Sequence, residues 1–231
     1  MDGEGGKLRA LVLYGGWEGH CPEEAADFAK SELLFDCDVQ TSNSLDCVDA
    51  SYLREFDVFL PIWTFGEINA AQERALLTCV ENGLGILAWH GATSAFLASR
   101  PHKHLLGGQF VAHPGGDSTT YRVEFSSTSE LARDLDGFEL TSEQYYMLVD
   151  PAVSVIATTK MVAEREMTWL RGVEAPVAWT RNWGKGRVFY CSIGHVVGDL
   201  RNPSVFRLLR RALKWTARTP ESSAQVQLAQ S

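Results

Sequence analysis

The chain has 231 residues, of which 45% are hydrophobic and 22% are charged, as in a globular protein with one sizeable core. Its formal net charge of −8 and pI near 5.3 argue against nucleic acid as the main partner, because phosphate binding needs clustered Lys and Arg. No apolar run approaches the roughly 20 residues of a membrane span, and the first residues lack a signal-peptide pattern.

The sequence therefore predicts a cytoplasmic protein without a membrane partner. Its five cysteines are odd in number and lack C-x-x-C spacing, which fits reduced thiols better than a zinc ribbon. One domain is the default at this length. We expect it to span residues 8–217, between a disordered N-terminus (1–7) and a disordered tail (218–231).

The first half of the chain alternates apolar runs with helical patterns. Strands are expected over 10–14, 37–40, 57–62 and 84–88, and helices over 22–33 and 69–81. Such alternation is typical of a mostly parallel sheet covered by helices on both faces. In sheets of this kind, ligands bind at the C-terminal ends of the strands.

The second half is less regular. We expect a Gly-rich loop over 107–116, strands over 121–125, 153–157, 175–180 and 187–191, a hairpin turn over 182–186 and a closing helix over 203–216. His102 and His104 are expected on a surface loop. The basic run near the C-terminus has helical spacing and is expected to form a solvated helix face; it comprises Arg207, Arg210, Arg211, Lys214 and Arg218.

The most informative segment is 83–93, where a short apolar run ends in small residues. Its spacing, Ala88-x-His90-x-Ala92, has the layout of a nucleophile elbow, a sharp turn from strand to helix that needs small flanking residues. Hydrolases of that design carry Ser or Cys at the centre. His90 cannot form their acyl-enzyme through oxygen or sulfur, although the turn is of a kind that supports chemistry.

Four histidines fall on loops after strands or in Gly-rich loops: His20, His90, His113 and His195. Each taken alone is more often structural than catalytic, so the case for a site depends on their meeting at one sheet edge. Glu143, beside two tyrosines, is the best candidate for a general base or for a group that orients a histidine. Asp199 could orient His195, although a helix cap is its more frequent role.

Aromatic residues flank the expected cleft, and sugars present apolar C–H faces that stack on such rings. They are Trp17, Trp63, Trp89 and Tyr145. Core packing is the more frequent role for any one of them. The chain has no G-x-G-x-x-G before a helix and no Walker loop, which argues against a bound dinucleotide.

Several motifs together resemble the ThuA-like (trehalose utilisation) family of the class I glutamine amidotransferase-like superfamily, over roughly residues 8–217. They are the elbow with His90, the Gly-Gly-Gln-Phe-Val-Ala-His-Pro loop at 107–114 (with Gln109 as a further substrate-binding candidate), Ser-Glu-Gln-Tyr-Tyr at 142–146, Pro-Val-Ala-Trp-Thr at 176–180, Gly-Lys-Gly-Arg-Val-Phe-Tyr at 184–190 and Gly-His at 194–195.

The resemblance implies a flavodoxin-like α/β sandwich. It also implies that His195 takes the place of the triad histidine, while His90 replaces the elbow cysteine, so that glutaminase activity is not expected. Family members are linked to disaccharide catabolism, beside NAD-dependent dehydrogenases that make 3-keto sugars, which makes such a dehydrogenase the expected pathway partner. The start of the chain, Gly-Gly-Trp-Glu-Gly-His-Cys at 15–21, departs from the His-rich start of some members.

Two classes of function remain open. The first is an enzyme that isomerises, eliminates from or hydrolyses a keto sugar or disaccharide derivative, with His90 or Glu143 as base and with His113 and His195 polarising the carbonyl or moving the second proton. A variant adds a divalent metal, Zn or Mn, on His20, His90, His113 or His195. The second is a non-catalytic sugar-binding or regulatory protein. Assembly into a homo-oligomer stays open.

Overall fold

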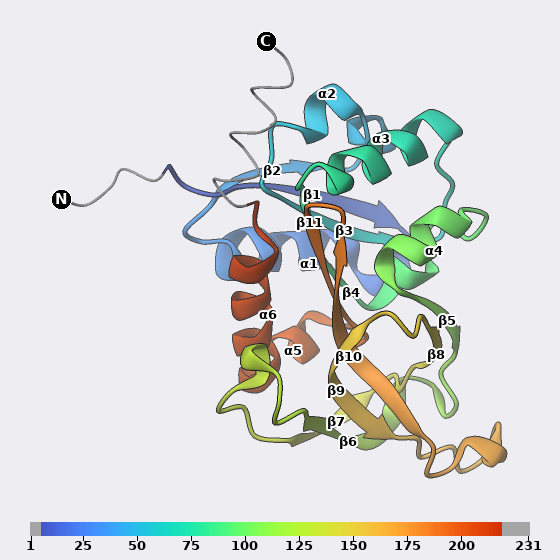
Figure 1. Cartoon of the computed structure of the whole chain (residues 1–231). Helices are drawn as coiled ribbons and strands as arrows, with labels where there is room; N and C mark the ends of the chain where they lie inside the picture. The colour runs from blue at the N-terminus through green and yellow to red at the C-terminus, as the bar shows by residue number, and fades with distance from the viewer. Residues whose placement is uncertain (1–5, 219–231) are drawn as a thin grey trace.

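A nine-stranded sheet runs through the computed structural model, which describes residues 6–218 (Figure 1). Its strands lie in the order β2 (Asp38–Ser42), β1 (Arg9–Gly16), β3 (Val58–Thr64), β4 (Gly85–Trp89), β11 (Gly186–Cys191), β10 (Glu174–Trp183), β9 (Ser154–Lys160), β6 (Thr119–Phe125) and β7 (Phe138–Ser142). The first five are parallel to one another. With β11 as fifth strand they have the flavodoxin-like order 2-1-3-4-5, which confirms the expected fold class.

Alternation along β1 divides the core into two layers. Ala10 and Val12 pack on one side of the sheet with α1 (Pro22–Phe28) and α6 (Pro203–Thr216). Leu11 and Leu13 pack on the other side with α2 (Ala50–Leu53), α3 (Ala70–Glu81) and α4 (Arg100–Leu106). Successive strand side chains point to opposite faces. An apolar run without polar alternation is therefore the expected sequence of a strand that helices cover on both sides.

The remaining elements are short. A π-helical turn (Ala29–Leu33) extends α1, and α5 (Val197–Leu200) precedes α6. Single 3₁₀ turns lie at Glu18–His20, Leu45–Cys47, His90–Ser94, Gly116–Ser118, Glu130–Ala132 and Thr168–Leu170. The predicted helices over 22–33, 69–81 and 203–216 thus form close to their expected bounds.

The second half of the sheet is antiparallel. The hairpin between β10 and β11 turns at residues 184–185, as expected. The Gly-rich segment expected as a loop over 107–116 is partly a strand, which is a correction. Residues of β5 (Gly108–Ala112) pair with β8 (Tyr146–Val149) in a separate two-stranded sheet, so backbone pairing there outweighs the conformational freedom of the two glycines.

His102 does not lie on a surface loop, which is a second correction. It is 2% exposed inside α4, with its ring 5.0 Å from that of Phe96. Ser99 caps this helix and Gly107 ends it in a left-handed conformation, so its start and stop signals are ordinary ones. His104 is exposed as expected, but on the helix.

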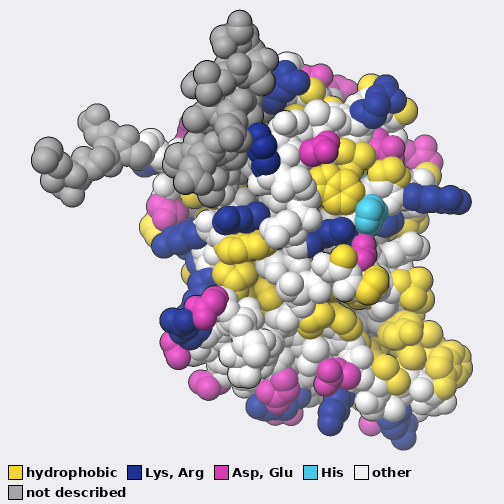
Figure 2. Space-filling model, viewed as in Figure 1, with side chains coloured by type: hydrophobic (Ala, Val, Ile, Leu, Met, Phe, Trp, Pro, Cys, Tyr) yellow, Lys and Arg dark blue, Asp and Glu magenta, His cyan; other side chains and the backbone are white. Residues whose placement is uncertain are grey.

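The surface and the termini add four observations. No helix in the described part of the chain is long and apolar enough to cross a membrane. On the face shown in Figure 2, basic and acidic side chains are interspersed. Arg207 and Lys214 of the basic run are exposed, whereas Arg210 forms an ion pair with Asp36. The predicted terminal disorder falls mostly on residues 1–5 and 219–231, outside the described residues.

We predict that His102 makes stability depend on pH. Burial, with the nearby charge of Lys103, lowers the pKa of His102 to about 3. Below pH ~6.5 the unfolded chain binds a proton at this residue that the folded chain does not, so the free energy of unfolding falls as pH falls, by up to about 1.4 kcal/mol per pH unit. In the His102→Phe variant, the free energy of unfolding measured with urea should therefore fall less steeply between pH 7 and pH 4.5.

The matched control is His104→Phe, because that histidine is exposed. Its pH profile of stability should follow that of the unaltered protein. Equal slopes for the His102 variant and the unaltered protein would contradict the assignment.

Candidate functional site

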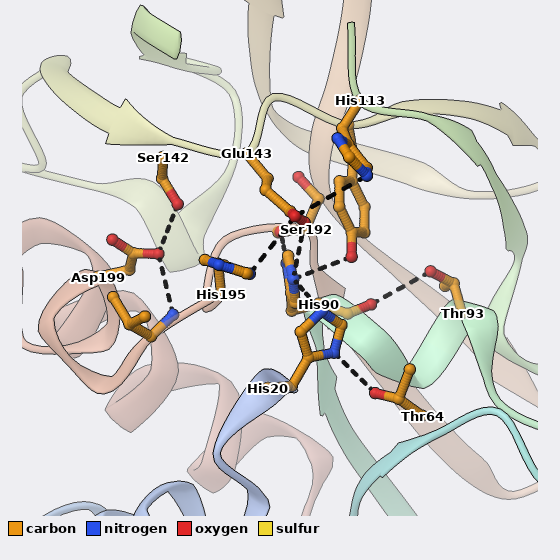
Figure 3. A network of polar contacts seen from close by, with 12 residues as sticks. His20, Thr64, His90, Thr93, His113, Ser142, Glu143, Ser192, His195 and Asp199 are labelled. Atoms are coloured by element: carbon orange, nitrogen blue, oxygen red, sulfur yellow. Dashed lines mark hydrogen bonds and ion pairs between the residues drawn. The ribbon is translucent and has the colours of Figure 1, made fainter. Parts of the chain in front are cut away.

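The C-terminal ends of the parallel strands bring four segments together. His20 lies in the turn after β1, Thr64 ends β3, His90 follows β4 and His195 follows β11. The strand order changes direction between β1 and β3, which is where open α/β sheets bind ligands. Glu143 reaches the same place from the segment between β7 and β8 (Figure 3).

Three imidazoles and one carboxylate converge in this site. One ligand atom from each of His20, His90, Glu143 and His195 lies within 4.8 Å of all the others. The Nε2 atom of His90 is 3.3 Å from Nε2 of His20 and 3.2 Å from Oε2 of Glu143. The Nδ1 atom of His195 is 3.5 Å from Oε1 of Glu143. We call these four residues the His/Glu cluster.

His90 occupies the elbow in a strained conformation. Its φ is +42°, in the left-handed region that a non-glycine residue seldom adopts. The hydroxyl of Tyr190 donates to its carbonyl oxygen at 2.8 Å, and its own Nδ1–H donates to the carbonyl of Ser192 at 2.9 Å. These bonds fix the ring so that Nε2 points into the cluster, where the Tyr145 hydroxyl lies 2.9 Å away.

His20 is held neutral beside His90. Burial, followed by the charge of His90, lowers the pKa of His20 to about 3. Its Nδ1 pairs with Oγ1 of Thr64 at 2.8 Å, so its Nε2 also faces the cluster. Gly91 leaves space for this pair, since a Cβ there would lie 2.0 Å from Thr64 Oγ1 and 2.8 Å from His20 Nδ1.

Glu143 supplies a buried carboxylate, 8% exposed. Burial alone would raise its pKa, but the hydrogen bond from His90 and the charges of the surrounding histidines outweigh burial and lower the pKa to about 2. The carboxylate is therefore ionised at neutral pH. The neighbouring side chain of Gln144 bonds to Thr159 and to the backbone at 160 and 162, which fixes the segment that carries Glu143.

The other two histidine assignments differ in detail. Nδ1 of His195 is buried and has no hydrogen-bond partner among the described residues. His113 lies at the edge of the site, with a side chain that is 41% exposed and Nε2 3.8 Å from Oε1 of Glu143. The four residues that could hold a metal thus include Glu143, whereas the sequence analysis named His113.

The expected substrate-binding residues fall into three places. Trp63 lines the cleft beside His20, and the Trp17 ring meets that of His20 at 4.7 Å. Trp89 also lines the cleft but is 4% exposed within the core. Gln109 is exposed on β5, one position before Phe110, whose ring packs on Tyr145; strand alternation therefore turns Gln109 away from the site.

Asp199 does not orient His195. Its carboxylate accepts hydrogen bonds from the Ser142 hydroxyl and the Val196 backbone N–H at the start of α5 (Figure 3). It therefore serves as a helix cap, the more frequent role. The sequence analysis missed Thr64, Gly91 and Ser192, although each lies at or next to the end of a parallel strand.

We predict that Gly91→Ala disturbs the site from the backbone side. The new Cβ has to displace Thr64 or His20, and overpacking of this kind costs about 1–3 kcal/mol. Urea unfolding should show the loss, and NMR of the His20 ring should show a changed environment. Gly198→Ala is the control, because the nearest atom to a Cβ there is 3.9 Å away. Equal stability of the two variants would refute the close approach.

Comparisons with known proteins support the fold. A ThuA-like protein from Bacteroides uniformis matches with a TM-score of 0.75 and 20% sequence identity over 93% of each chain. A second ThuA-like protein, from Parabacteroides merdae, matches with a TM-score of 0.75 and 14% sequence identity, over 91% of this chain and 90% of that one. A cold-adapted β-galactosidase from Rahnella sp. R3 has 0.60 at 16%, covering 91% of this chain and 31% of that enzyme. These likenesses show the fold.

A search of curated proteins found no match. The ThuA family model, described as trehalose utilisation, matches residues 9–216. Because that match covers nearly the whole described chain, the protein belongs to the ThuA family.

Proposed function

We propose that this protein is a metal-assisted enzyme of carbohydrate metabolism that moves a proton next to the ketone of an oxidised sugar. The observation that carries the proposal is the His/Glu cluster, whose four ligand atoms lie within 4.8 Å of one another. A ThuA family member with such a cluster fits a role in the utilisation of a disaccharide such as trehalose.

The spacing of the cluster suits a small divalent ion. Zinc bonds to nitrogen and oxygen of about 2.0–2.2 Å place tetrahedral ligand atoms about 3.3–3.6 Å apart. Three of the six separations come close to that range, at 3.3 Å between His20 and His90, 3.2 Å between His90 and Glu143 Oε2, and 3.5 Å between Glu143 Oε1 and His195, and all ligand atoms lie within 4.8 Å of one another. Nδ1 of His195, buried 3.5 Å from Glu143 and without a hydrogen bond among the described residues, is the polar atom that such an ion would satisfy.

The protonation states suit the same ion. Metal binding requires neutral imidazoles and an ionised carboxylate. His20 has a pKa of about 3 and Glu143 one of about 2, so both are in the required form at neutral pH. His90 and His20 are each oriented through Nδ1, by Ser192 and Thr64, as ligating histidines usually are.

Two groups remain for proton transfer once the cluster holds the ion: His113 and Tyr145. Burial raises the pKa of Tyr145 far above its usual value, so its hydroxyl stays protonated and can donate a hydrogen bond to the substrate ketone oxygen. An imidazole exchanges protons near neutral pH. His113, at the edge of the cluster beside Glu143, is placed to act as the base.

The proposed reaction is an isomerisation with no net change in composition. His113 removes the proton from the carbon next to the ketone, and the electron pair of that C–H bond forms a C=C bond while the carbonyl electron pair moves onto the ketone oxygen, giving an enediolate. The proton of the neighbouring hydroxyl passes to the former ketone oxygen, and His113 returns its proton to the former carbonyl carbon, so the ketone moves by one carbon. A bound Zn²⁺ or Mn²⁺ would act as a Lewis acid on the carbonyl.

A sugar dehydrogenase that oxidises a ring hydroxyl with NAD would supply this substrate. Glutamine hydrolysis is not proposed, because His90 stands at the elbow where a thioester-forming cysteine would be required.

We predict about one equivalent of Zn²⁺ or Mn²⁺ per chain in protein dialysed against either metal, measured by mass spectrometry of the metal. His90→Ala and Glu143→Gln should weaken binding by more than about 100-fold, since losing even an outer partner of a ligand costs about 10–100-fold. His104→Ala, on the surface of α4, should bind like the unaltered protein. Equal metal content in all four proteins would contradict the site.

We predict that the protein exchanges deuterium from D₂O into the carbon next to the ketone of 3-keto-trehalose, followed by NMR. His113→Gln should retain the metal but slow exchange by about 10²- to 10⁴-fold, the usual contribution of a general base. Chelator should abolish exchange. Sugar binding without any exchange would support the sugar-binding or regulatory alternative over an enzyme.

A further inference from the structure

Two large aromatic side chains are exposed next to the His/Glu cluster, and the nearer one, Trp17, packs edge-on against the ring of His20. Trp17 follows β1 and Phe65 follows β3, and each is 46% exposed. Their ring centroids lie 6.0 Å apart at an interplanar angle of 51°. Both residues therefore stand at the C-terminal strand ends where the strand order changes direction.

Phe65 is held there in a strained backbone conformation. Its φ is +61°, a value that is a genuine outlier for a bulky residue. Its N–H donates to the carbonyl of Ser94, and its carbonyl accepts from the N–H of Phe96, so the segment after the elbow fixes it. Gly66, the next residue, also has a positive φ. Strained residues of this kind cluster at active sites and ligand clamps, and Phe65 shares the conformation with His90 of the cluster.

The pair is close to the chemistry. The Trp17 ring centroid is 4.7 Å from that of His20, and the His20 ring centroid is 4.5 Å from that of His90. The rings themselves offer apolar faces, which suit the C–H face of a sugar.

The charges next to the aromatic pair disfavour a phosphate group on the part of a ligand that lies there. Glu18 and Glu67 follow Trp17 and Phe65 closely in the sequence, and both are exposed carboxylates. They would repel a phosphate on a sugar ring that rests on the two aromatic side chains, away from the ion proposed in the cluster.

We infer that Trp17 and Phe65 form a stacking platform that binds one face of an uncharged, unphosphorylated sugar ring and orients it toward the His/Glu cluster. This inference rests on the proposed function for its ligand class. It adds Phe65 as a specificity-determining residue and excludes sugar phosphates as the preferred substrates.

Phe65→Gly provides the sharpest test, because glycine accepts the positive φ at no steric cost. The variant should unfold at the same or a higher urea concentration, whereas loss of a packing residue would lower it. The KM for 3-keto-trehalose should rise about three- to tenfold, as expected for one lost aromatic face, with a smaller change in kcat. Trp17→Ala should act in the same direction, and Phe65→Tyr should restore the KM.

Trp169→Ala is the matched control, since that tryptophan is 75% exposed in another part of the chain. Trehalose should quench the fluorescence of the unaltered protein and of the Trp169 variant, but quench that of the Trp17 variant much less. Trehalose 6-phosphate should compete with 3-keto-trehalose more weakly than trehalose does. Tighter binding of the phosphate, or an unchanged KM in both platform variants, would overturn the inference.

The two proposals fail separately. If the platform variants keep the KM while His90→Ala loses turnover, the platform is refuted and the enzyme stands. If the unaltered protein shows no turnover, the enzyme proposal is refuted. Fluorescence quenching by trehalose still tests the platform in that case, because quenching that is present in the unaltered protein and absent from the Trp17 variant supports it. Absence of quenching in the unaltered protein refutes the platform.

Discussion

The site depends on how the backbone is held where β4 ends. Tyr190, a fully buried residue of β11, donates its hydroxyl proton to the carbonyl of His90, and the ring of His90 donates to Ser192 just past the end of β11. Together they tie the strained elbow to the neighbouring parallel strand. Because one anchor holds the backbone of His90 and the other holds its ring, both are fixed at once, and that ring makes the contacts to His20 and to Glu143.

The cluster holds ionisable side chains in a buried place, where their protonation states depend on one another. His20 is kept uncharged by burial, while Glu143 is kept ionised only because the histidines around it outweigh burial. A protein interior seldom retains such a carboxylate unless it is paired. Apolar core residues pack on both sides of the sheet around the site. Their burial stabilises the fold and offsets the free energy that burying the polar cluster costs.

The parallel half of the fold could be predicted from the sequence because its central strands β1, β3 and β4 are nearly continuous apolar runs, whereas the edge strand β2 is mostly polar. The two-stranded sheet of β5 and β8 could not, since glycines at 107–108 weaken any strand signal and pairing with a distant segment decides the outcome. The sequence did not predict the burial of His102, because α4 has only seven residues and its polar residues at 102–104 give no apolar helical period. For the site, residue type located His20, His90, Glu143 and His195, but only the assembled fold shows that Glu143 stands nearer to their centre than His113.

The order of the strands has a consequence for how the protein is made. β11 enters the sheet between β4 and β10, so the strand that anchors the elbow is the last one synthesised. A growing chain on the ribosome can form β1 to β4 and their helices, yet it lacks both Tyr190 and His195. The cluster can therefore arise only in the final stage of folding, through contacts between segments about 100 residues apart, such as the one from His90 to Ser192. A chain that ends before β11 therefore cannot assemble the His/Glu cluster.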